Sequence, residues 1–273
     1  MKKRKLIVSD IDGTLLNSHK KISEKTKRRI EALIESGHVF AVATGRMHGA
    51  GKTITTELDY DGFLISCNGA VVKHLKSGEV IQAIEVDPDI VRKVVSVCQT
   101  YEATYFFYEI DTIYASAYKH LAKTYSEKMV SLPESHRFTI EFPMDMLEIV
   151  GTKPIYKIAI SHDDKVKFRK LIDEIRTLSG IESVKSLDTL FDVMTAGVSK
   201  AKGIEALQRH FGIDREDVIA FGDNENDIDM VSYAGIGVAM SNAMEELKVA
   251  ADFVTKSNDE EGLVYALDHF GID

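Results

Sequence analysis

Two aspartates stand two positions apart directly after a short apolar run, and they are the side chains of this chain best placed to do chemistry. Residues 6–8 predict a buried strand, and Asp10, Asp12 and Gly13 follow it. Side chains two apart on an extended backbone point to the same side, so these carboxylates would repel each other without a cation, a shared proton or a basic partner. The alternative is a solvated turn, since Asp and Gly are ordinary turn residues.

Polar residues also follow three other apolar runs that are short enough to be strands: Thr44, Gly45 and Arg46 after residues 39–43, Asn68 after residues 63–66, and Asp223, Asn226 and Asp227 after residues 218–221. Parallel strands bring their carboxyl ends to one edge of a sheet, where open α/β sheets bind ligands. A group of carboxylates at such an edge suits Mg²⁺. Thr, Lys and backbone N–H groups nearby suit phosphate oxygens.

Strands and helices alternate at both ends of the chain, which predicts βαβ units in a doubly wound, Rossmann-like parallel sheet. The pattern changes between residues 85 and 190. An aromatic-rich strand at residues 104–108 and a polar, weakly patterned stretch through His136 belong to a mixed α+β block there. We therefore predict an α/β core domain in two parts, 1–84 and 191–273, with an α+β domain inserted at 85–190.

Composition limits the possible partners and location. The net charge of −9 argues against nucleic acid or an anionic membrane surface as the main partner. Two cysteines without metal-ligand spacing favour reduced thiols. The basic residues 1–5 precede too short an apolar run for a signal peptide, and no run approaches the length of a membrane span. We therefore expect a cytoplasmic protein, with no membrane partner.

The motifs together resemble those of haloacid-dehalogenase-superfamily phosphatases, specifically the Cof-like group (type IIB), which carries a large α/β cap between its second and third motifs. Four motifs carry the resemblance in order: Asp10-Ile11-Asp12-Gly13-Thr14, Ala43-Thr44-Gly45-Arg46, Gly197-Val198-Ser199-Lys200 and Gly222-Asp223-Asn224-Glu225-Asn226-Asp227. The resemblance implies Mg²⁺ as cofactor and Asp10 as the nucleophile that forms an aspartyl-phosphate. It also implies that Asp12 is the general acid, and we expect neighbouring acids and partial burial to raise its pKa.

The resemblance implies further roles. Thr44 would donate to a phosphate oxygen and Asp223 would bind Mg²⁺, with Asp227 supporting the metal or the lysine. Asp10 would bind the metal through its side chain, and Asp12 through its backbone carbonyl. Two lysines compete for the third motif, Lys200 and Lys202. We favour Lys200, because Ile204 then has the apolar spacing that follows the lysine of the family.

The remaining candidates have structural alternatives. Gly45, Arg46, Asn68 and Asn226 are expected at the substrate, although Arg46 could form a surface salt bridge and Asn68 could adopt a left-handed turn. His48 is expected in a surface loop rather than at the site.

The function that these residues favour is Mg²⁺-dependent hydrolysis of small phosphorylated metabolites. Sugar phosphates are the first substrate candidates, with pyridoxal phosphate and FMN as others. The alternatives are a phosphomannomutase-like phosphotransferase and a non-catalytic protein that binds phosphorylated metabolites. We expect a monomer or a weak homodimer.

Overall fold

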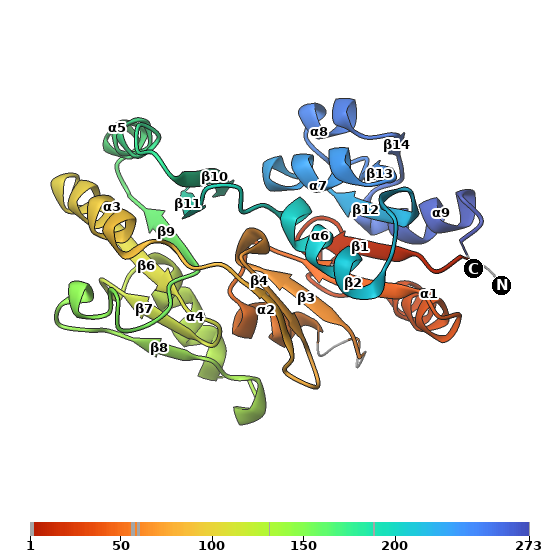
Figure 1. Cartoon of the computed structure of the whole chain (residues 1–273), viewed down its shortest axis with the longest axis horizontal. Coiled ribbons are helices and arrows are strands. Elements are labelled where there is room, and N and C mark those ends of the chain that lie inside the picture. The colour runs from red at the N-terminus through yellow and green to blue at the C-terminus, as the bar shows by residue number, and fades with distance from the viewer. Residues whose placement is uncertain (1–2, 56–57, 59–60, 131, 188, 273) are drawn as a thin grey trace.

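The computed structural model describes residues 3–55, 58, 61–130, 132–187 and 189–272. These residues form an eight-stranded sheet, here called the core sheet, and a six-stranded sheet, here called the cap sheet. Figure 1 shows the two sheets side by side, with both chain termini at the end of the molecule far from the cap sheet. Residues 1 and 2 of the predicted basic stretch lie outside the described part.

The core sheet places β1 in its middle, between β12 and β2. Its strands run parallel from β14 to β3, and the β4–β5 hairpin completes it in antiparallel pairing. In sheet order they are β14 (Phe253–Val254), β13 (Ile236–Ala239), β12 (Val218–Gly222), β1 (Leu6–Asp10), β2 (Val39–Ala43), β3 (Phe63–Ser66), β4 (Val71–His74) and β5 (Val80–Ala83).

Helices cover both faces of the core sheet. One apolar cluster contains residues of α6 (Lys200–Phe211), α7 (Ile228–Tyr233) and α8 (Glu245–Ala250). The cluster on the other face contains residues of α1 (Glu24–Glu35), α2 (His48–Thr55) and α9 (Gly262–His269). In α1, Ser23 caps the first turn and Ile30 and Leu33 are buried on one face. Each of these two side chains contributes about 1.5–3 kcal/mol by burial.

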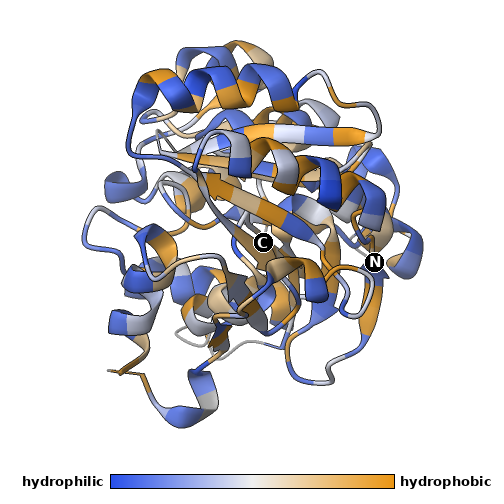
Figure 2. Cartoon of the chain, turned by 90° about the vertical axis from the view of Figure 1, so that its left-hand side faces the viewer, coloured by the Kyte–Doolittle hydropathy of each residue, from blue (hydrophilic) through white to orange (hydrophobic). Residues whose placement is uncertain are grey.

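The cap sheet has the order β10-β11-β9-β6-β7-β8, and α3 and α5 pack on one of its faces. Figure 2 shows mostly hydrophobic strands beneath helices of alternating hydropathy. The elements are α3 (Pro88–Thr100), β6 (Thr104–Tyr108), β7 (Thr112–Ala115), α4 (His120–Val130), β8 (Thr139–Glu141), β9 (Lys157–Ser161), α5 (Lys165–Ile175), β10 (Ile181–Leu187) and β11 (Leu190–Thr195).

The other face of the cap sheet packs against the core. Met47, Cys67 and Val71 of the core side share one buried apolar cluster with Phe106 and Tyr108 of β6. The cap sheet is therefore held over the carboxyl ends of β2 and β3, where site residues are predicted.

The structure confirms the predicted fold class, with a parallel α/β core and an inserted α+β segment. The cap sheet extends past the predicted boundary at residue 190, because β11 pairs with β10 from Leu190 to Thr195. The division into domains remains a prediction. Along the described ranges, no helix is both long and apolar enough to cross a membrane.

Two helices differ from the sequence predictions. Helix α4 lies in the stretch that was expected to be weakly patterned, and α2 contains His48, which was expected in a surface loop. His48 is 2% exposed, and burial together with Lys73 and Lys52 lowers its pKa to about 3. The glycines of α2 conceal the helix in the sequence. Gly51 is needed there because a Cβ would lie 2.8 Å from a methyl carbon of Leu64.

Candidate active site

The loop after β1 contacts the loop after β12. Gly13 has a left-handed backbone (φ +86°), and a Cβ at this position would lie 2.3 Å from Oδ2 of Asp223. The next residue, Thr14, donates a hydrogen bond of 2.8 Å from its hydroxyl to Oδ1 of Asp223. Parallel pairing of β1 with β12 brings these loops to the same edge of the sheet.

Three carboxylates and one lysine lie at this edge. Asp10, Asp223 and Asp227 each offer a carboxylate oxygen within 4.8 Å of the others. Lys200, at the start of α6, places Nζ 2.5 Å from Oδ1 of Asp10 and 2.5 Å from Oδ1 of Asp227. Lys200 is 1% exposed and Asp227 is fully buried. The predicted residues Asp10, Lys200, Asp223 and Asp227 are therefore brought together.

Burial and mutual repulsion set the protonation of this cluster. Burial, followed by the charge of Asp227, raises the pKa of Asp10 well above its ordinary value. The same two causes raise the pKa of Asp223 to about 6. Burial acts to lower the pKa of Lys200, but Asp10 and Asp227 outweigh it and hold that pKa above its usual range. The raised pKa values of Asp10 and Asp223 indicate that Lys200 does not fully offset burial and repulsion among the carboxylates.

The cluster suits a hard dication such as Mg²⁺. Its ligands are all carboxylate oxygens, which Mg²⁺ prefers. Hydrogen bonds engage Oδ1 of Asp10 and Oδ1 of Asp223, and among the described residues Oδ2 of each has no such partner. Asp227 differs, because its Oδ1 accepts from Lys200 and its Oδ2 accepts the backbone N–H groups of Asp223 and Asn224, both at 3.0 Å. Asp227 thus positions the lysine and the loop.

Asp12 lies apart from these three side chains. Its Oδ2 accepts from Nε of Arg46 at 2.9 Å and from Nη2 at 2.7 Å, and its Oδ1 lies 3.3 Å from Nζ of Lys20. Burial acts to raise the pKa of Asp12, but Arg46 and Lys20 outweigh it, so the pKa is lowered. The prediction of a raised pKa was wrong, because it did not anticipate that Arg46 reaches this carboxylate.

The weaker candidates lie on adjoining loops. The Thr44 hydroxyl accepts the N–H of Arg46 at 3.1 Å, and the Gly45 carbonyl accepts from Nζ of Lys157 at 2.5 Å. Asn68 has the left-handed backbone that the turn alternative predicted (φ 53°). Its Oδ1 accepts from Nδ2 of Asn226 at 3.1 Å.

A cavity of about 350 Å³ lies between the core loops and the cap. Its lining includes the following predicted residues: Asp10, Asp12, Thr44, Gly45, Arg46 and Asn226. Asn68 contacts this group through its hydrogen bond with Asn226.

The profile of the haloacid dehalogenase-like hydrolase family matches residues 7–267. The chain belongs to this family. The Bacillus subtilis (strain 168) protein YkrA, named provisionally as a phosphatase, is 32% identical over 270 residues, or 98% of each chain. The 5-amino-6-(5-phospho-D-ribitylamino)uracil phosphatase YitU of the same organism is 26% identical, over 97% of each chain.

Solved structures agree with this family. The subclass IIB sugar phosphatase BT4131 has a TM-score of 0.81 with this chain at 29% identity, covering 98% of this chain and 100% of that one. The predicted phosphatase family is therefore confirmed, and the chain is a phosphatase-type member of the haloacid dehalogenase-like hydrolases.

Sequence reasoning missed the residues that the cap contributes to the cavity. Lys157 of β9 and Asp192 of β11 line it, and they are 2% and 0% exposed. A charged residue inside an otherwise apolar strand is a usable signal, because Lys and Asp are rarely buried without a partner. This signal could have marked both residues as candidates, but it does not predict that they form an ion pair with each other.

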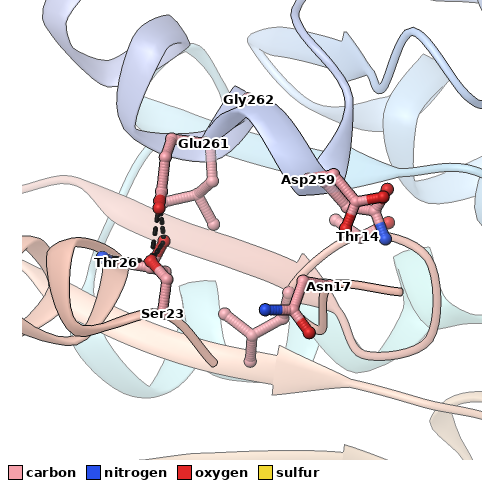
Figure 3. A pocket seen from close by; sticks show the side chains of 10 residues that line it. Thr14, Asn17, Ser23, Thr26, Asp259, Glu261 and Gly262 are labelled. Carbon is pink, nitrogen blue, oxygen red and sulfur yellow. Dashed lines mark hydrogen bonds between the residues drawn. The ribbon is translucent and has the colours of Figure 1, made fainter. Parts of the chain in front are cut away.

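A second cavity, of about 30 Å³, lies behind the loop that contains Thr14 (Figure 3). The hydroxyls of Ser23 and Thr26 each donate a 2.8 Å hydrogen bond to Oε2 of Glu261, at the start of α9. This volume holds about one water molecule. The residues around this cavity therefore join the first loop to the C-terminal helix, and the cavity itself is too small for a substrate.

Gly13→Ala should reduce both stability and activity. The added Cβ would be strained at φ +86° and would displace Asp223 from its place beside Asp10. We expect a loss of about 1–3 kcal/mol in the free energy of unfolding and a weaker dependence of activity on Mg²⁺, measured by urea unfolding and by Mg²⁺ titration. Gly37→Ala is the matched control, because Gly37 has φ +89° and nothing within 4 Å of a built Cβ. Equal activity losses in the two variants would contradict the role of Gly13.

Proposed function

We propose that this chain hydrolyses phosphate monoesters of small metabolites, with Mg²⁺, through an aspartyl-phosphate on Asp10. One observation carries the proposal: Lys200 lies 2.5 Å from both Asp10 and Asp227, with Asp223 beside them, at the end of the central strand. A buried carboxylate held by a lysine and next to a dication site is positioned to attack a phosphoryl group.

Asp10 and Asp223 would hold Mg²⁺, together with the backbone carbonyl of Asp12. The metal would neutralise phosphate charge that Lys200 alone does not balance. Asp227 would keep Lys200 and the loop after β12 in place.

The chemistry would proceed in two displacements. A carboxylate oxygen of Asp10 attacks phosphorus, the bond from phosphorus to the leaving oxygen breaks, and Asp12 gives its proton to that oxygen. Asp12 then takes a proton from a water molecule, whose oxygen attacks phosphorus and breaks the bond to Asp10, releasing inorganic phosphate. For the first step Asp12 must lose its pairing with Arg46. We infer that the substrate phosphate, with two negative charges, draws Arg46 to itself and releases Asp12.

The substrates we propose are sugar phosphates first, with pyridoxal phosphate and FMN as further candidates. Subclass IIB membership and the sugar phosphatase BT4131 support the first group. The activity named for YitU supports other small phosphorylated metabolites of similar size as substrates. A cavity of about 350 Å³ beneath the cap accommodates a small metabolite.

The test is phosphate release from p-nitrophenyl phosphate and from a panel of sugar phosphates and cofactors. We expect turnover with Mg²⁺ and its loss in excess EDTA, with recovery when Mg²⁺ is restored. Isomerisation of a hexose 1-phosphate without phosphate release would favour the phosphotransferase alternative instead. Tight binding of phosphorylated metabolites without any turnover would favour the binding protein.

A further inference from the structure

The cap side of the large cavity is almost free of unbalanced charge. Among the described residues, the cap contributes two charged side chains to its lining, Lys157 and Asp192. The other cap residues of the lining are uncharged: Tyr108, Leu121, Thr124, Tyr125, Ser186 and Leu190. The part of a substrate that extends away from the phosphate must contact these residues.

The positive charge of Lys157 is already used. Its Nζ lies 2.7 Å from Oδ2 of Asp192, donates to the Gly45 carbonyl at 2.5 Å and lies 4.6 Å from the ring centre of Tyr108. Asn68 adds a donor to the same Asp192 oxygen at 3.2 Å. A buried lysine with three such partners has little capacity to bind an anion.

Two acceptor atoms in the lining residues lack partners. Oδ1 of Asp192 and Oγ of Ser186 are buried and have no hydrogen-bond partner within the described ranges. Both atoms have almost no accessible surface, so a substrate hydroxyl would reach them only after a side chain moves, whereas the exposed Thr124 already offers its hydroxyl to the cavity. A carboxylate oxygen cannot accept from a phosphate dianion or a carboxylate, and it repels both.

The positive side chains on the core side are paired as well. Arg46 and Lys20 both pair with Asp12, beside the nucleophile. The cations that line this cavity, Arg46, Lys20 and Lys157, are therefore all paired with carboxylates of the lining.

We propose that this cavity selects monophosphates whose leaving group is uncharged and bears hydroxyl groups, and that it disfavours a second phosphate or a carboxylate on the leaving group. The inference rests on the proposed phosphatase function and adds a charge rule to it. An anion placed beside the Lys157–Asp192 pair would lose its hydration without gaining a free cation. The tyrosine and leucine side chains of the lining suit the C–H faces of a sugar or polyol.

A matched substrate pair tests the rule. Glucitol 6-phosphate and 6-phosphogluconate have the same chain and differ at one terminal group, which is CH₂OH in the first and a carboxylate in the second. We expect kcat/KM for glucitol 6-phosphate to be at least about tenfold higher. For the same reason, kcat/KM for fructose 6-phosphate should be higher than kcat/KM for fructose 1,6-bisphosphate.

A charge variant makes the test specific to the cap. Thr124 is exposed on α4 and lines the cavity, so Thr124→Lys adds a cation without burying one. This variant should reduce the preference for glucitol 6-phosphate over 6-phosphogluconate several-fold relative to Thr124→Gln, which is similar in size and uncharged. A ratio that is the same in the Lys and Gln variants would overturn the assignment to this face.

The outcomes distinguish failure of the charge rule from failure of the proposed phosphatase function. If wild type hydrolyses p-nitrophenyl phosphate with Mg²⁺ but uses 6-phosphogluconate as well as glucitol 6-phosphate, the charge rule is overturned and the phosphatase function stands. If p-nitrophenyl phosphate is not hydrolysed either, the proposed function fails and the charge rule fails with it.

Discussion

Asp10→Asn should lower kcat by about 10³-fold or more, an increase of about 4 kcal/mol in the activation free energy. The amide keeps the volume of the carboxylate but is too weak a nucleophile to form the phosphoryl intermediate. Phosphate release from p-nitrophenyl phosphate at saturating Mg²⁺ is the measurement, and circular dichroism shows whether the variant is folded. Asp173→Asn makes the same change at an exposed position on α5 and should leave kcat unchanged.

Asp12→Ala separates the two steps of the same scheme. This variant keeps the nucleophile but lacks the group that activates water, so the phosphorylated enzyme should accumulate and be visible by mass spectrometry. Asp10→Asn should show no phosphoryl adduct under the same conditions. Near wild-type turnover in either folded variant would contradict the aspartyl-phosphate scheme.

The acidic part of the site could be predicted because strand ends determine it. Asp10 and Asp223 follow apolar runs, and parallel pairing of β1 with β12 makes such positions neighbours whatever lies between them in sequence. Lys200 could be preferred over Lys202 because the apolar period of α6 places the first inward: it is 1% exposed, whereas the Lys202 side chain is 40% exposed. These inferences need only element type and direction.

Contacts between side chains of distant segments could not be predicted in this way. Arg46 pairs with Asp12 across 34 residues, and Lys157 donates to Gly45 across 112. Both contacts depend on rotamers and on how the cap sheet rests on the core. The pKa of Asp12 was predicted in the wrong direction for this reason, since the loop pattern gives its neighbouring acids but not its cationic partners.

Helix α2 was hidden for another reason. His48 and the glycines of α2 have weak helix propensity, and the helix is favoured by close packing against β3 and the cap. Gly49, for example, donates its backbone N–H to the Ile110 carbonyl in the cap at 3.0 Å. Tertiary packing of this kind leaves no periodic signal in the sequence.

Lys200→Met should lower kcat by about 10³-fold and destabilise the protein at neutral pH. The lysine is the buried cation between Asp10 and Asp227, and removing one partner of a buried ion pair costs about 3–5 kcal/mol. Lys202→Met is the matched control two residues away. Its side chain pairs with Glu205 at the surface, so we expect a change within about 0.5 kcal/mol and little effect on kcat.

The pH dependence of stability distinguishes this explanation from a simple packing defect. In wild type the folded-state pKa of Asp10 already lies above its unfolded value, and loss of the lysine would raise it further. A carboxyl with a raised pKa binds more protons in the folded state, so its unfavourable effect grows as pH rises above about 4 and disappears as pH falls. Urea unfolding at pH 7.5 and pH 5 should therefore show a larger stability difference between Lys200→Met and wild type at pH 7.5. A difference independent of pH would indicate lost packing instead of uncompensated charge, and a greater loss of kcat in Lys202→Met would reverse the assignment of the catalytic lysine.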